Sequence, residues 1–120
     1  MLLKAKESYR FWFLLYTDFP RIHRYTLGDK IEECFLSLLE HIFFGLYLDV
    51  NKKIIRLEYA IAKLDALKFF TQLAYENKCI PENKYLELSI QLQEIGRMLG
   101  GWKKGLEKKI MEQKTPAPNI

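Results

Sequence analysis

Histidine, cysteine and carboxylate side chains could hold a metal or transfer a proton, but their spacing in this sequence fits neither role. His23 and His41 have no carboxylate or cysteine three or four residues away that would complete a convincing metal site. The Glu-x-x-His pair that builds di-iron sites in helical bundles is absent. Glu40 directly precedes His41, so a helix would turn the two side chains to different faces. We therefore expect no enzyme, no catalytic residue, no metal site and no cofactor, although a site assembled between subunits would leave no such signature.

Basic residues gather near the C-terminus and suggest a surface for an anionic partner. Residues 97–114 contain six lysines and arginines against two glutamates, which accounts for the net charge of +4. Smaller basic groups lie at residues 21–24 and 52–56. The alternative is a helix end whose lysines complement the helix dipole. The predicted partner-binding residues are Arg21, Arg24, Lys52, Lys53, Arg56, Arg97, Lys103, Lys104 and Lys108.

Three glycines within residues 96–101 interrupt a strongly helical pattern at the start of this basic segment. Inside a helix each glycine costs about 1 kcal/mol relative to alanine, so their presence needs a reason. With the apolar residues of the segment facing inward, Arg97, Lys104 and Lys108 fall together on the opposite side, at about 100° per residue. The glycines then either end or kink the helix, or let another backbone approach it closely.

Helical periodicity runs through almost the whole chain, and no strand-like alternation of useful length appears. Helices are expected at residues 5–18, 26–48 and 51–77, the second starting at a capping box and the third at an N-cap. The capping residues are Thr26 and Asn51. A fourth helix begins near Pro81 and carries a heptad seam of apolar residues: Tyr85, Leu88, Leu92, Ile95, Leu99, Trp102 and Leu106.

Four helices with short connections predict an all-α protein, an antiparallel up-down four-helix bundle. The 120 residues, 49% of them hydrophobic, suffice for one domain with a sizeable core. The bundle is expected to cover residues 1–114, and the two prolines of residues 115–120 predict a disordered tail.

Apolar residues exceed what a single bundle needs. Residues 11–16 are apolar or aromatic without a break, and residues 36–48 carry several apolar residues outside the main stripe. A helix that is apolar nearly all round is buried nearly all round, which indicates self-association or a large partner, and of these we expect a homo-oligomer. The alternative is a large core with some exposed aromatic side chains. The predicted subunit contacts are Phe11, Trp12, Phe43, Phe44, Gly96 and Gly100.

The expected compartment is the cytoplasm, without a membrane partner. The longest apolar run, residues 11–16, is far shorter than the roughly 20 residues that span a bilayer. Residues 1–10 are mixed and charged, unlike a signal peptide. Cys34 and Cys79 are the only cysteines, and we expect both to be free thiols.

Two segments carry a distinctive combination of residues: Phe19-Pro-Arg-Ile-His-Arg-Tyr-Thr-Leu-Gly-Asp-Lys-Ile31 and Glu94-Ile-Gly-Arg-Met-Leu-Gly-Gly-Trp102. Together they resemble the accessory variability determinant family of diversity-generating retroelements. That family is related to small four-helix-bundle proteins encoded in intervening sequences of 23S ribosomal RNA genes. The shared pattern covers most of the chain, from Phe19 to Lys104.

The resemblance implies a basic, barrel-shaped homopentamer of four-helix bundles that binds the retroelement's reverse transcriptase and its template RNA or cDNA. Such proteins are needed for mutagenic copying of template RNA into a variable gene, and the reverse transcriptase carries the catalysis. The residues that carry over are Arg21, Arg24, Arg97 and the turn Gly100-Gly101-Trp102. The alternatives are a bundle protein of the intervening-sequence type and an oligomeric scaffold that binds no nucleic acid.

Overall fold

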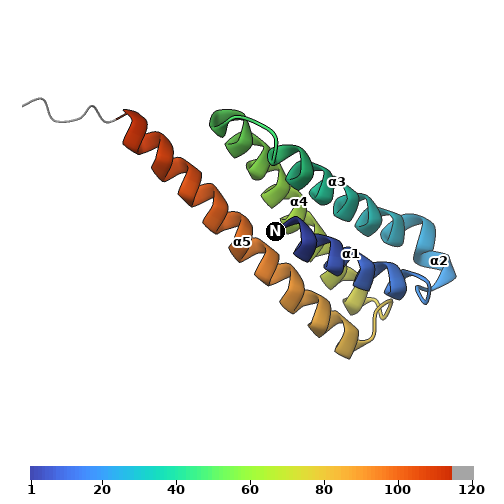
Figure 1. Cartoon of the computed structure of the whole chain (residues 1–120). Coiled ribbons are helices and arrows are strands. Elements are labelled where there is room, and N and C mark those ends of the chain that lie inside the picture. The colour runs from blue at the N-terminus through green and yellow to red at the C-terminus, as the bar shows by residue number, and fades with distance from the viewer. Residues whose placement is uncertain (115–120) are drawn as a thin grey trace, which may run out of the picture.

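The long helices of the chain form an antiparallel bundle (Figure 1). The computed structural model describes residues 1–114, and every regular element among them is a helix. The long helices are α1 (Leu2–Tyr16), α3 (Asp29–Gly45), α4 (Val50–Glu76) and α5 (Glu82–Lys114). The prediction of an all-helical bundle is therefore confirmed, whereas the predicted tail at residues 115–120 lies outside the described residues.

The core contains one apolar stripe from each long helix. Trp12 of α1 and Phe35 of α3 are the largest fully buried side chains, and their rings stack with centroids 6.3 Å apart. The heptad seam predicted for the last helix is buried from Leu88 to Leu99, and Trp102 and Leu106 are half-buried where the bundle ends. The burial of these side chains, which recur on one side of α5, stabilises the packing of α5 against α4 and α1.

Helix α4 starts at a cap that differs from the predicted one. Asp49, not Asn51, is the N-cap: its backbone is extended, and its Oδ1 accepts a hydrogen bond from the Lys52 amide at 3.0 Å. Asn51 lies inside the first turn and is exposed. Asp49 can act as the cap because a capping side chain accepts from an amide two or three residues further along, and Lys52 is three residues after Asp49. The predicted end near Asn77 is confirmed, since Asn77 is the C-cap.

The corner between α1 and α3 consists largely of helical turns, whereas the sequence predicted no helix between residues 18 and 26. Helix α1 ends at Tyr16, two residues earlier than expected, and Pro20 precedes a single helical turn, α2 (Arg21–His23). A π-helical turn, η1 (Arg24–Gly28), then continues directly into α3. The predicted capping box at Thr26 is wrong, because the Thr26 hydroxyl donates back to the His23 carbonyl at 3.4 Å and the helix has already begun.

Helix α5 is unbroken at its glycines. It runs from Glu82 to Lys114, so Gly100 and Gly101 do not end it. Apart from the adjoining residues and backbone of α5 itself, no described atom lies within 4 Å of where a Cβ would sit on Gly100, Gly101 or Gly105. In Figure 1 the last turns of α5, drawn in red, extend past the other helices. The glycines therefore lie on an open stretch of helix surface.

Candidate partner-binding surface

A basic stripe runs along the outer face of α5. Arg97, Lys104 and Lys108 are exposed, and their spacing places them on one side of the helix over about 16 Å of its axis. Within the described part of the chain, none of the three forms an ion pair or hydrogen bond. Cations without internal partners are the ones available to an anionic ligand. We call these three residues the α5 stripe.

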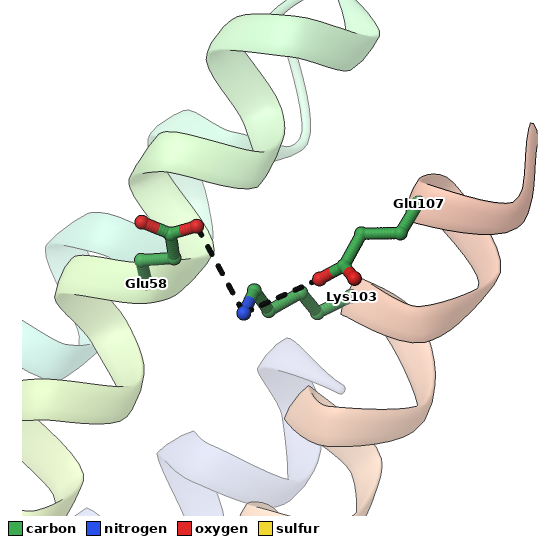
Figure 2. Close-up of polar contacts among 3 residues, drawn as sticks. All are labelled: Glu58, Lys103 and Glu107. Carbon is green, nitrogen blue, oxygen red and sulfur yellow. Dashed lines mark ion pairs between the residues drawn. The ribbon is translucent and has the colours of Figure 1, made fainter. Parts of the chain in front are cut away.

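Lys103, which was predicted to belong to the same surface, instead connects two helices. Its Nζ lies 3.8 Å from Glu58 Oε1 on α4 and 3.2 Å from Glu107 Oε1 on α5 (Figure 2). Figure 2 shows the ammonium group between the two carboxylates. The two carboxylates balance the positive charge of Lys103, so this residue attracts a separate anion less strongly than an unpaired lysine would.

The basic residues at the start of α4 are divided in the same way. Arg56 Nη1 lies 3.2 Å from His41 Nδ1, and its guanidinium lies 5.5 Å from the centre of the Phe44 ring. Lys53 places its ammonium 5.8 Å from the Trp102 ring of α5. The two cation–π contacts, of Arg56 with Phe44 and of Lys53 with Trp102, are internal and favourable. Lys52 alone of this group is exposed.

The two arginines of the corner also have different environments. Arg24 is half-buried, and its Nη2 donates to the carbonyls of Thr17 at 3.2 Å and Phe19 at 3.4 Å, just after the end of α1. It therefore pairs with two carbonyl groups of the link that follows α1. Arg21 is exposed. The nine predicted residues thus separate into five exposed ones (Arg21, Lys52, Arg97, Lys104 and Lys108) and four engaged within the chain (Arg24, Lys53, Arg56 and Lys103).

The predicted subunit contacts are equally mixed. Phe43 and Phe44 are 44% and 45% exposed, and their rings pack edge to face. Phe11 is half-buried beneath the Lys84 ammonium. Trp12 is fully buried inside its own bundle and has no surface to offer another subunit, so we remove it from the predicted contacts.

The glycine positions in that set also differ from one another. A Cβ on Gly96 would lie 3.3 Å from Leu64 Cδ2 and from Lys68 Nζ. The close approach predicted for Gly96 is therefore with α4 of the same chain. Gly100 has open space in front of it.

A half-buried hydrogen-bond network between α1 and α3 was not predicted from the sequence. The Glu32 carboxylate, half-buried, accepts a hydrogen bond from Trp12 Nε1 at 2.7 Å and another from the Tyr9 hydroxyl. Burial, together with donation to the negative Glu32, raises the pKa of Tyr9 to about 12. The signal was the position of Glu32 three residues before the core residue Phe35, which places it beside the apolar stripe.

Tyr16 makes a second contact of this kind, about two turns after Tyr9 along α1. Its hydroxyl donates to Asp29 Oδ1 at 2.7 Å and lies 3.0 Å from the Arg24 carbonyl. Burial and the Asp29 carboxylate raise the pKa of Tyr16 to about 12. Both phenols therefore remain protonated donors across the physiological range.

The described residues contain no obvious metal site or membrane span. In residues 1–114, no group of three or more His, Cys, Asp or Glu could hold a metal ion. Over the same residues, no helix is both long enough and apolar enough to cross a membrane. An open groove of about 520 Å³ lies at the α4–α5 corner, between Asp18, Tyr75 and Cys79 among others. Burial raises the pKa of the Cys79 thiol, which disfavours the reactive thiolate.

Fold and surface together define an antiparallel helical-bundle protein with a basic stripe on its longest helix. The chain belongs to the bAvd-like family, whose model matches residues 3–106. This match includes both segments that resemble accessory variability determinants and confirms that resemblance. A comparison with curated proteins found no match.

Proposed function

We propose that this chain is a non-enzymatic accessory protein of a diversity-generating retroelement. It binds the reverse transcriptase and the template RNA or cDNA, and it thereby supports mutagenic copying of the template. The polymerase supplies the chemistry, and this chain supplies binding surfaces. The observation that carries the proposal is the family match over residues 3–106.

The α5 stripe supports the nucleic-acid part of the proposal. Its three cations are exposed on one helix face and have no carboxylate partner among the described residues. Beside them, Gly101 and Gly105 leave the helix surface open. A phosphate backbone can approach such a surface closely, and each phosphate that is neutralised releases counterions.

Exposed aromatic side chains support self-association, for which we propose a homopentamer. Phe43, Phe44 and Tyr47 lie together at the end of α3, with Phe43 packed against both of the others. Burying such a cluster against a second copy removes apolar surface from water. The compartment that we propose is the cytoplasm, and Cys34 and Cys79, both buried free thiols, are compatible with it.

Co-purification tests the proposal directly. The tagged full-length chain is expressed with the reverse transcriptase of its retroelement and captured with and without RNase. Retention of the polymerase in both samples is the expected result. Loss only after RNase would mean that RNA bridges the two proteins, and no retention in either sample would contradict the proposal in favour of an intervening-sequence-type protein or a scaffold.

A charge reversal tests the α5 stripe. Arg97→Glu with Lys104→Glu should weaken RNA binding and flatten its dependence on salt, because log K falls by about 0.7–0.9 per phosphate contact for each tenfold increase in salt. Lys6→Glu with Arg10→Glu, two exposed residues of α1, makes the same change in charge and serves as the control. Equal loss in both pairs would show that only net charge matters, and no loss in either would exclude the stripe as the site.

A further inference from the structure

The corner between α1 and α3 presents large apolar side chains to solvent. Ile22 is 82% exposed and Tyr25 is 76% exposed, the two highest values among the large hydrophobic residues of the described chain. They lie three residues apart, in the consecutive short turns α2 and η1. Arg21, also exposed, precedes them directly. We call Arg21, Ile22 and Tyr25 the corner triad.

The backbone beneath the corner triad is held firmly. The Arg24 carbonyl accepts a hydrogen bond from the Asp29 amide, five residues on, and lies 3.0 Å from the Tyr16 hydroxyl. The Arg24 guanidinium in turn holds the carbonyls of Thr17 and Phe19. Contacts from α1 therefore fix a π-helical turn, a conformation that is rare and occurs frequently at functional sites.

Gly28 completes this arrangement through close packing. A Cβ at Gly28 would lie 2.7 Å from Tyr16 Cε2, so the α1 ring occupies the space that a side chain would need. The φ of Gly28, −60°, is one that any residue can adopt. A side chain at this position is therefore excluded only by lack of space. The turn is thus determined by neighbouring residues and not by its own exposed side chains.

A connection between two helices has no need of exposed isoleucine and tyrosine. Single exposed apolar residues are common on protein surfaces, but here two lie in consecutive turns with an arginine, next to the backbone that Arg24 and Tyr16 hold. Tyrosine and arginine are enriched among the residues that dominate protein–protein binding, and a preordered segment loses little conformational entropy on binding. The corner triad has the composition and the rigidity of a binding epitope.

We propose that the corner triad is a docking site for a protein that offers an apolar pocket bordered by carboxylates. Ile22 and Tyr25 would fill the pocket, and Arg21 would pair with the acidic border. The triad has a single exposed cation, Arg21, beside two apolar side chains. This composition favours a protein partner over nucleic acid, whose binding depends on several cations that contact phosphates. This proposal rests on the proposed function, in which that protein is the reverse transcriptase.

Affinity measurements on matched variants test the docking site. Ile22→Ala with Tyr25→Ala should weaken binding of the full-length chain to the purified, RNase-treated reverse transcriptase by about tenfold or more. Ile90→Ala with Phe69→Ala is the control, because these side chains are 66% and 59% exposed on α5 and α4. The control pair should bind within about twofold of the unaltered chain. Circular dichroism confirms that both variants are folded.

A single charge reversal tests the acidic border. Arg21→Glu should also reduce the affinity, and added salt should narrow the difference from the unaltered chain. Arg10→Glu, an exposed arginine of α1, is the matched control and should have a smaller effect. An equal loss of affinity for Arg21→Glu and Arg10→Glu would contradict the proposal that Arg21 pairs with carboxylates of the partner.

The outcomes separate this proposal from the proposed function. If the unaltered chain binds the polymerase and the Ile22 and Tyr25 variant binds equally well, the corner proposal fails and the proposed function stands. Equal weakening by the control pair would also overturn the corner as a specific site. If the variant loses RNA binding but keeps the polymerase, the corner contacts nucleic acid and the proposal is wrong. If the unaltered chain does not bind the polymerase, both proposals fail.

Discussion

The Glu32 carboxylate joins α1 to α3 through two side-chain donors, Tyr9 and Trp12. An exposed glutamate would contribute little, but a half-buried one leaves its donors without partners when it is removed. It also explains why Trp12, an aromatic residue with a polar N–H, can be completely buried. At the scale of single residues, this contact fixes α1 against α3.

Replacing Glu32 by glutamine tests the contact. Each carboxylate oxygen accepts from a different donor, whereas a glutamine amide has one acceptor oxygen and an NH₂ group that can only donate, so one of the two donors loses its acceptor. Glu32→Gln should therefore lower the free energy of unfolding by about 1–3 kcal/mol in a urea titration. Glu33→Gln, at an exposed neighbouring position, should change it by less than about 0.5 kcal/mol. Equal values for the two variants would contradict the structural role of Glu32.

The raised pKa values of Tyr9 and Tyr16 predict a loss of stability in alkaline solution. Both values move from 10.0 to about 12, so the folded chain holds these phenol protons more tightly than the unfolded chain does. The stabilisation is complete below pH 10 and is lost as the pH rises to about 12. Melting temperatures across this range should fall less steeply for Tyr9→Phe than for the unaltered chain. Parallel curves would show that Tyr9 is not responsible.

At the scale of elements, the apolar periodicity of the sequence predicted those features of the helices that depend only on which side chains are buried. The α5 seam and the end of α4 near Asn77 follow from the apolar spacing, and both are confirmed. The π-helical corner could not be predicted, because Tyr16 and Arg24 fix its backbone through contacts with another helix. The candidate site was limited in the same way: a sequence shows that Lys103 is basic, but not that Glu58 of α4 lies beside it.

Two glycine substitutions with opposite expected signs test the element-level description. Gly28→Ala should destabilise the chain by about 1–3 kcal/mol, because the new methyl group would collide with the Tyr16 ring. Gly101→Ala has open space and a helical backbone, so it should stabilise the chain by about 0.5–1 kcal/mol. Thermal melts of both variants check the two signs, and a stabilising Gly28→Ala would contradict the packing of Tyr16 at the corner.

At the scale of the whole molecule, the proposed oligomer depends on the aromatic cluster at the end of α3. Phe43→Ser with Phe44→Ser should reduce the mass in solution, measured by multi-angle light scattering, towards that of one chain. Leu86→Ser with Ile90→Ser, 53% and 66% exposed on α5, is the control and should leave the mass unchanged. A single-chain mass for the unaltered protein would contradict the oligomer itself.

The overhanging end of α5 has a consequence for how different parts of the molecule exchange amide hydrogens with solvent. Residues 107–113 are exposed apart from the half-buried Ile110, and a helix this short is marginal in water by itself. Its amides should take up deuterium much faster than those between Leu88 and Leu99, which the bundle protects. Any partner that covers this end would slow the uptake there, so the overhang itself would report the binding event.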